Sequence, residues 1–261
     1  MSKSLFLRIV HRLSTEVAYF APTQDAVGRS SLSPLQKCTA AIRQLAYGGG
    51  ADTVDEYWKN CPTAWKGMYS RGTDKPTIVL EAVASYDLWI WHAFFGAPGT
   101  MNDLNILDRS PVFDDIIKGI APQVNFNVNG REYDFAYYLT DGICPEWATF
   151  IQSIQLPQGP KHSLFAKTQE SVRKDVERAF GVMQARFAVI KNPSNLWDKS
   201  KITNIMRACI ILHNMIVEDE RRTQTQDETF QDEDIYFCVK MPFSIHLIVG
   251  QKFGVDQSID N

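Results

Sequence analysis

Three acidic side chains stand at positions where carboxylates could carry out metal-dependent chemistry. Asp141 follows an apolar run at the end of a predicted strand, directly before Gly142, where a side chain emerges at a sheet edge. Glu177 lies in a predicted amphipathic helix, one residue away from its apolar stripe, and Asp103 begins another helix. Metal-dependent phosphoryl chemistry needs two or three carboxylates that converge on divalent cations, and Mg²⁺ prefers oxygen ligands. These three residues are therefore candidate metal ligands.

Spacing alone does not distinguish such a site from ordinary acidic residues on the surface. Asp103 is equally consistent with a carboxylate that the dipole of its own helix favours. Other kinds of site find less support in the residues. The five cysteines lack zinc-ligand spacing, no Gly-X-Ser-X-Gly pattern occurs, and the glycines 48–50 are not followed by the Lys-Ser/Thr of a phosphate-binding loop.

The order of predicted elements indicates a mixed α/β domain preceded by a small helical region. A Ser33-Pro34 start signal and the glycines 48–50 delimit one early helix. Tyr86-Asp87 predicts a turn between two strands, and an apolar stripe predicts a helix over 172–190. The other segments are helices near 5–13, 52–57 and 202–217 (the last apolar nearly all round and expected to be buried), strands over 77–85, 87–96 and 135–142, and a helix over 102–120 broken at Pro111. The apolar segment 237–253 has no predicted place.

Composition and charge exclude several classes of protein. The chain has 261 residues, of which 44% are apolar and 22% charged, and no apolar run is long enough for a membrane-spanning helix. The first residues are too polar for a signal peptide, and scattered cysteines, odd in number, are typical of reduced thiols in an intracellular protein. A net charge of -3 argues against unaided binding of duplex DNA. Residues 158–207 nevertheless carry ten basic against four acidic residues, and residues 218–234 carry eight acidic against two basic ones. The basic stretch could face phosphates or form a solvated helix surface.

Six segments in order closely resemble plant PIF/Harbinger-type transposases and the nucleases derived from them. They are AIRQLAYGGGADTVDEY, WKNCPTAWKGMYSRG, KPTIVLEAVASYDLWIWHAFFGAPGTMNDLNIL, YYLTDGICPEW, RKDVERAFGVMQARF and RACIILHNMIVEDER. The resemblance covers roughly residues 1–222. It implies a ribonuclease-H-like fold, a DDE-type site that binds Mg²⁺ or Mn²⁺ and cuts DNA, and a nuclear location, or the cytoplasm when the partner is absent. It also implies a Myb-like or trihelix-type partner that binds the DNA.

The resemblance assigns the acidic positions only in part. Glu177, in DVERAFG, falls on the third acidic position of the family. Asp141, in YLTDG, and Asp103, in PGTMND, both match signatures for the second position, and both assignments remain open. The first acid should lie on the first, central strand, shortly before Trp58, and no residue matches it. The chain instead runs directly from the helical sequence DTVDEY into WKNCPTAW, which indicates an internal deletion or an incomplete gene model.

Two hypotheses follow. The first is a metal-dependent DNA endonuclease, impaired because the first aspartate is absent. The second is a non-catalytic derivative that acts as a nuclear interaction or chromatin-associated subunit. The predicted organisation is a helical region at 1–57, a truncated nuclease domain at 58–222 and a divergent tail at 223–261. In an active relative the basic residues around Glu177 would hold DNA phosphates, or else pair with neighbouring acids on the helix surface: Arg173, Lys174, Arg178 and Arg186.

The aromatic and histidine residues have an expected structural role as well as a possible functional one. The tryptophans in and beside the strands could stack on bases, but they are more often core residues. His213, on a mostly apolar helix, is expected to be a buried histidine with a hydrogen bond, and His92 on a strand is similar.

Overall fold

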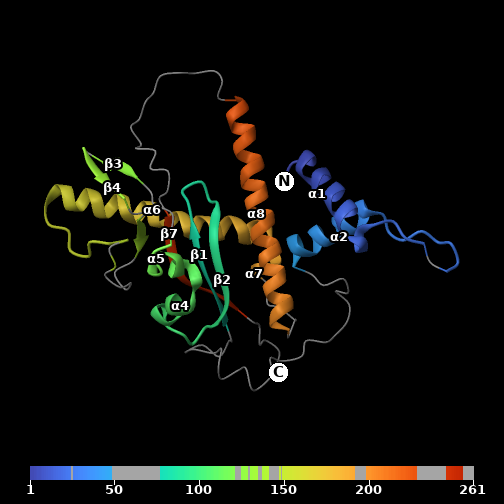
Figure 1. The fold of residues 1–261 in the computed structure, drawn as a ribbon, viewed down its shortest axis with the longest axis horizontal. Helices are drawn as coiled ribbons and strands as arrows, with labels where there is room; N and C mark the ends of the chain where they lie inside the picture. The colour runs from blue at the N-terminus through green and yellow to red at the C-terminus, as the bar shows by residue number, and fades with distance from the viewer. Residues whose placement is uncertain are drawn as a thin grey trace, which may run out of the picture.

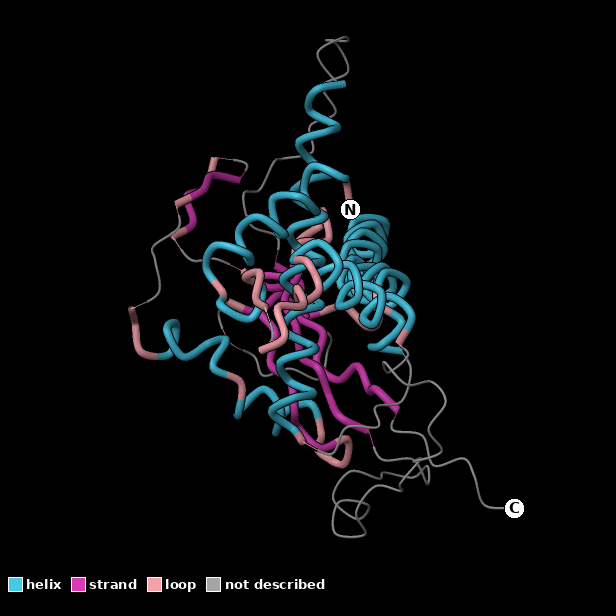
Figure 2. Tube along the Cα trace, turned by 90° about the vertical axis from the view of Figure 1, so that its right-hand side faces the viewer, coloured by secondary structure: helices cyan, strands magenta, loops and turns pink. Residues whose placement is uncertain are grey.

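The computed structural model describes residues 1–24, 26–48, 77–120, 125–128, 130–134, 137–140, 147, 149–191, 198–227 and 245–254. A five-stranded mixed sheet lies between helices on its two faces (Figures 1 and 2), which confirms the predicted α/β class. Its strand order is β2-β1-β7-β5-β6. The strands are β1 (Thr77–Ala84), β2 (Ile90–Pro98), β5 (Tyr138–Thr140), β6 (Phe150–Gln152) and β7 (Ile245–Gly254). Strands β3 (Phe126–Val128) and β4 (Arg131–Tyr133) form a separate hairpin that the sequence analysis missed, as it missed β6.

The N-terminal helices begin and end close to the predicted signals. The helix predicted over 172–190 begins earlier and is broken, at Gly159–Arg186 and Ala188–Lys191, and the helix predicted over 202–217 extends over Lys199–Asp227. In α2 (Pro34–Tyr47), Ser33 and Gln36 form a capping box, and Gly48 ends the helix with a left-handed φ of 68°, which glycine adopts without steric cost. The helix predicted up to Pro111 is α4 (Asp103–Arg109), and a short 3₁₀ turn at Pro111–Phe113 leads into α5 (Asp114–Ile117). The remaining helices are α1 (Lys3–Glu16), the 3₁₀ turn Ala18–Phe20, α6 (Gly159–Arg186), α7 (Ala188–Lys191) and α8 (Lys199–Asp227). The short helix predicted at 52–57 lies outside the described residues.

One face of the sheet packs against the two long helices, α6 and α8, which cross beside it (Figure 1). The predicted stripe on α6 supplies much of this core, since Val176, Phe180 and Met183 are fully buried there. Burial of α8 is less complete than predicted: Ile211 is 58% exposed, because only one side of the helix contacts β2 and α6. In the described part of the chain, no helix has the length and apolar character needed to cross a lipid bilayer.

The opposite face of the sheet packs against α4 and the turn that follows it. Phe113 is buried there and meets Tyr138 and Phe150 edge-on, at ring-centroid distances of 4.9 Å each. The core interpretation of the tryptophans is wrong for Trp91 and Trp147, which are 53% and 38% exposed, while Trp58 and Trp65 lie outside the described residues. Two apolar layers therefore sandwich the sheet, with α4 on one side and α6 with α8 on the other.

The central strand of the sheet comes from the C-terminal segment that the sequence analysis could not place. β7 pairs antiparallel with β1 and parallel with β5, and it alone joins the β1–β2 hairpin to the β5–β6 pair within the described sheet. The family resemblance places the missing first strand in the middle of the sheet, so β7 fills that position. The domain boundaries after residues 57 and 222 remain a prediction, but a strand of the third region lies inside the sheet of the second.

Candidate functional site

The structure describes the whole of Glu177, only the backbone of Asp103, and nothing of Asp141 among the three predicted carboxylates. Glu177 lies on α6 directly after the buried Val176, and its own side chain is exposed. The Glu177 side chain makes no hydrogen bond or ion pair with any other residue that the structure describes. Asp103 is the first residue of α4, where the Asn102 side chain accepts a hydrogen bond from the Asn105 N–H at 2.8 Å. The orientation of the Asp103 side chain lies outside what the structure describes.

Asp141 lies outside the described residues, immediately after β5. Its neighbour Thr140 is fully buried, and no described residue is a hydrogen-bond partner of the Thr140 hydroxyl. The predicted approach of Asp141 and Glu177 to within metal-bridging distance, about 4–8 Å, is therefore untested and stays a prediction. Among the described residues, no group of three or more histidine, cysteine, aspartate or glutamate side chains could hold a metal ion.

The first acidic position of the predicted site has no counterpart on the strand that occupies the middle of the sheet. β7 has the sequence IHLIVGQKFG, which contains neither aspartate nor glutamate. Its position between β1 and β5 is set by backbone pairing, with Ala84 and Leu139 both opposite His246. The donor set for two divalent metal ions is therefore incomplete on this strand.

The predicted DNA-contacting residues of α6 are mostly engaged with acidic neighbours. Lys174 lies 3.7 Å from Glu170, and Arg178 lies 2.7 Å from Asp175, so the predicted alternative of pairing on the helix is realised at both positions. Arg186 donates to both carboxylate oxygens of Glu220 on α8, at 2.6 and 2.8 Å. The side chain of Arg173 is outside what the structure describes. Contact of these residues with DNA remains a prediction.

Asp175 is a buried acidic residue of α6, with a side chain that is only 9% exposed. Desolvation raises the pKa of Asp175, while the charge of Arg178 lowers it. Spacing could have identified this residue, because Asp175 lies three residues after Val172 and four before Ala179, and residues at these spacings share one face of a helix. Asp175 thus anchors a basic residue beside the exposed Glu177.

Two of the segments that carry the family resemblance, one in α8 and one in the β1–β2 hairpin, are joined by hydrogen bonds. His213, fully buried on α8, donates from Nε2 to the Leu88 carbonyl at 2.8 Å, which confirms the expected buried histidine. Burial lowers the pKa of His213. The adjacent Asn214 accepts from the Ile90 N–H at 2.9 Å and donates to the Ile90 carbonyl at 2.7 Å. Since β2 is an edge strand, this side chain satisfies backbone groups that β1 leaves unpaired.

The tip of the same hairpin is held by a charged residue of α8. Arg221 forms an ion pair with Asp87 and lies over the Trp89 ring, with its guanidinium carbon 5.1 Å from the ring centroid. Leu88, at the turn, adopts a positive φ of 71°, a conformation that costs a non-glycine residue about 1–2 kcal/mol. The turn's own hydrogen bond from the Leu88 N–H to the Ser85 carbonyl and the contacts of Arg221 on both sides of Leu88 hold this conformation.

A buried polar cluster that the sequence analysis missed lies on the α4 face of β1. Glu81 is fully buried, and its carboxylate lies 3.8 Å from His92 Nε2. The Ser110 hydroxyl lies 3.2 Å from the same nitrogen. The sequence signal for this cluster was a glutamate in the middle of the apolar strand TIVLEAVA. A strand that is apolar on both faces is buried on both faces, so this glutamate had to be buried as well.

The electrostatics of this cluster are dominated by burial. Desolvation raises the pKa of Glu81 to about 7, and the nearby Ser110 hydroxyl opposes the rise. Neither carboxylate oxygen makes a well-formed hydrogen bond with a described residue. Burial also lowers the pKa of His92, so both side chains resist their charged forms. Glu81 has no direct partner residue on β7, since the β1–β7 register shifts between Leu80 and Ala82.

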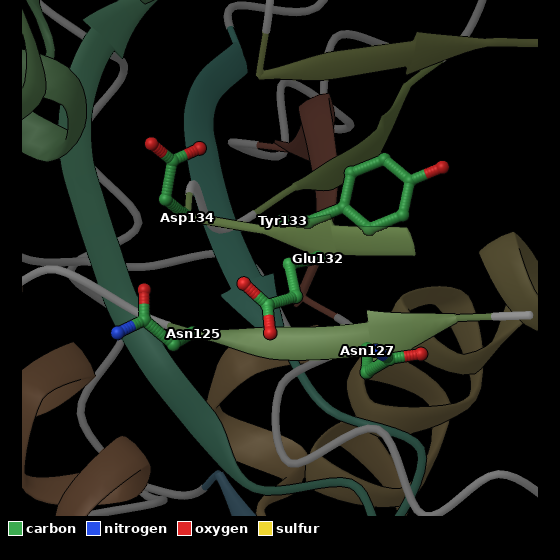
Figure 3. A pocket seen from close by; sticks show the side chains of 5 residues that line it. All are labelled: Asn125, Asn127, Glu132, Tyr133 and Asp134. Atoms are coloured by element: carbon green, nitrogen blue, oxygen red, sulfur yellow. The ribbon is translucent and has the colours of Figure 1, made fainter. Parts of the chain in front are cut away.

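An open hollow of about 490 Å³ lies along the β3–β4 hairpin and contains none of the predicted site residues. In Figure 3, Asn125 and Asp134 lie at the open end of this hairpin, and the Glu132 side chain lies between its two strands. The Asn127 side chain is used locally, because its oxygen accepts from the Gly130 N–H at 2.9 Å in the hairpin turn. The polar groups here are exposed to solvent and provide no buried recognition surface.

Comparison with known proteins defines the family. Residues 27–224 match the family described as plant transposon protein. This range includes β1, β2 and the segments of α8 that contact them. The chain therefore belongs to that family, and it is a Harbinger-derived, transposase-like protein. A relative from Arabidopsis thaliana, described as Protein ALP1-like, is 22% identical over 169 residues, which are 62% of this chain and 40% of the relative. The chain thus corresponds to less than half of that relative. No solved structure matches the chain.

Proposed function

We propose that this chain is a transposase-derived nuclear protein that acts as an interaction subunit and does not cut DNA. The observation that supports this proposal is the central strand β7, which completes the sheet without supplying an acidic residue. DDE chemistry requires carboxylates that fix two divalent ions for in-line attack. With one of the three acids absent, the remaining candidates offer too few ligands to impose that geometry: Asp103, Asp141 and Glu177.

The replacement of the missing central strand by β7 also preserves the folded sheet on which an interaction surface depends. A sheet without its central strand would leave β1 and β5 with unpaired edges, which favours aggregation. β7 pairs with β1 along most of the length of both strands, from Thr77 opposite Gly254 to Ala84 opposite His246. The chain can therefore keep a folded surface for a partner after the loss of the catalytic strand. The partner class we propose is a Myb-like or trihelix-type DNA-binding protein, which would compensate for the net charge of -3.

A cleavage assay tests this proposal against the nuclease hypothesis. Purified protein is incubated with supercoiled plasmid and Mg²⁺ or Mn²⁺, alongside the Asp141→Asn and Glu177→Gln variants. We expect no nicking above the background that both variants show. Nicking by the wild-type chain that either variant abolishes would overturn the proposal and establish a metal-dependent nuclease.

A second experiment addresses the partner. Candidate Myb-like and trihelix-type proteins from the same species are coexpressed with the chain, and complexes are measured by size-exclusion chromatography with light scattering. We expect a stable complex that E177Q leaves intact, since Glu177 would have no catalytic task. The transcript across Tyr57 and Trp58 is sequenced in parallel. A longer product that encodes an acidic residue there would restore the nuclease hypothesis.

A further inference from the structure

The Glu81 cluster combines full burial with an incomplete set of partners. Glu81 has no exposed surface, and both of its carboxylate oxygens lack a hydrogen-bond partner among the described residues. A buried ionised carboxylate is costly unless a positive group or several donors compensate it. His92 lies 3.8 Å away, beyond hydrogen-bond distance, and burial lowers its pKa and so opposes the charged form that would compensate Glu81. Among the residues whose side chains the structure describes, only the Ser110 hydroxyl favours the ionised carboxylate, and it makes no well-formed hydrogen bond to it.

Two oxygen atoms of the cluster lie close to the same nitrogen of His92. Glu81 Oε2 and Ser110 Oγ lie 3.8 and 3.2 Å from His92 Nε2. With bond lengths of about 2.0–2.2 Å, two ligands of a tetrahedral zinc ion lie about 3.4 Å apart. Both observed separations are close to that value. Glu81 and His92 are held on adjacent strands, because Phe94 and His92 of β2 pair with Glu81 and Val83 of β1 and so share one face of the sheet.

The third donor is fixed by the end of α4. The Ser110 backbone N–H donates to the carbonyls of Ile106 and Leu107, and its hydroxyl lies 3.4 Å from the Val112 N–H. Ser110 itself is 5% exposed. His92, with 24% of its side chain exposed, connects the buried cluster to the surface. The three donors thus come from three separately anchored points of the fold.

We infer that Glu81, His92 and Ser110 form a binding site for a single divalent cation of the class that takes nitrogen and oxygen ligands, such as Zn²⁺ or Mn²⁺. Glu81 supplies the negative charge, His92 binds through neutral Nε2, Ser110 contributes its hydroxyl oxygen, and water completes the coordination. The site is distinct from the predicted DDE carboxylates: Asp103 lies at the other end of α4, and Glu177 lies on α6, which packs against the opposite face of the sheet. A bound ion would join β1, β2 and α4.

Metal titration of the full chain tests this inference. The protein is stripped with EDTA, dialysed, and titrated with Zn²⁺ and Mn²⁺ by calorimetry, and with Co²⁺ by visible absorption, which reports the coordination geometry. We expect one ion per chain and a higher melting temperature on Zn²⁺ binding. The E81Q and H92Q variants each remove one ligand and should weaken the affinity at least roughly tenfold, since even the loss of indirect support for a ligand costs 10–100-fold. S110A should have a smaller effect in the same direction.

The controls separate this site from the DDE carboxylates. D141N and E177Q should bind the ion as the wild type does, whatever the cleavage assay gives. Circular dichroism of the metal-free variants checks that E81Q and H92Q are folded, and the surface variant H162Q controls for loose histidine binding. Absence of stoichiometric binding by the wild type would overturn the inference. Equal affinity in wild type, E81Q and H92Q would overturn it as well.

Discussion

The two faces of β1 differ in chemistry although they belong to one strand. Leu80, Ala82 and Ala84 face α6 and α8 in an entirely apolar cluster. Val79 and Val83 face the opposite way, and Glu81 lies between them with its charge-bearing group fully buried. The first face therefore gains stability from burial alone, whereas the second face loses some of it by desolvating a carboxylate. A stability cost kept at one position in a core is typical of a functional group.

The largest effect is expected on the apolar face. Phe180→Ala removes a fully buried ring of α6 that packs in the cluster with Leu80 and Ala82. The loss of transfer free energy and the resulting cavity should lower the free energy of unfolding by about 3–5 kcal/mol. Urea denaturation followed by circular dichroism measures it. Ile211→Ala, on the exposed side of α8, is the matched control and should cost far less.

On the polar face of β1, we expect the Glu81→Gln substitution to raise the stability, by an amount that depends on pH. Because burial raises the pKa of Glu81 from 4.5 to about 7, its ionisation in the folded protein is penalised. The wild type should lose about 3 kcal/mol as the pH rises from 4.5 to 7, since each unit of pKa shift corresponds to about 1.4 kcal/mol. E81Q lacks this penalty and should be more stable than the wild type at pH 8, and similar to it at pH 4.5.

This comparison requires metal-free protein and attention to His92. EDTA is present throughout, because a cation bound at Glu81 would offset the penalty in the wild type. The lowered pKa of His92 acts in the opposite direction, and its contribution is lost as the pH falls through 6.5. The E81Q/H92Q double variant separates the two groups. An E81Q curve parallel to the wild-type curve across this pH range would contradict the assigned penalty.

A third prediction tests whether α8 supports both faces through the edge of β2. Asn214→Ala leaves the N–H and carbonyl of Ile90 without their side-chain partner. Unpaired backbone groups in this half-buried place should cost about 1–3 kcal/mol. Amide hydrogen exchange at Ile90 should also accelerate more than at the β1 amides. Uniform acceleration across the sheet would mean that Asn214 stabilises the whole fold and not the edge of β2.

Sequence patterns predicted the elements that bury apolar residues at a regular period. The α6 stripe, the Ser33 cap and the β1–β2 turn depend on neighbours in the chain, and each was found where expected. The place of β7 could not be predicted, because strand pairing with β1 and β5 depends on residues more than a hundred positions away. Short strands such as β6, with three residues, carry too little periodicity to detect.

The candidate site was predictable only as far as a motif extends. Glu177 could be assigned from DVERAFG, and the structure places it exposed on α6, while its role as a metal ligand stays a prediction. The sequence already predicted that the first acid is absent, and the structure adds that β7, which carries no acidic residue, occupies the central position. The cluster of Glu81, His92 and Ser110 could not be read from the sequence, because it depends on the register of β1 against β2 and on where α4 ends.

The smallest effect on stability is expected from a substitution on the exposed face of α6. The same substitution tests whether this face contacts DNA. Lys174→Ala removes an i,i+4 ion pair between side chains that are 57% and 43% exposed, so the free energy of unfolding should change by no more than about 0.5 kcal/mol. If Lys174 binds a phosphate, the variant should weaken DNA binding and make it less dependent on salt. Fluorescence anisotropy at several salt concentrations measures this, with Lys161→Ala, earlier on the same helix, as the control. Equal loss in both variants would indicate a diffuse charge effect, whereas loss in K174A alone would assign a contact beside Glu177.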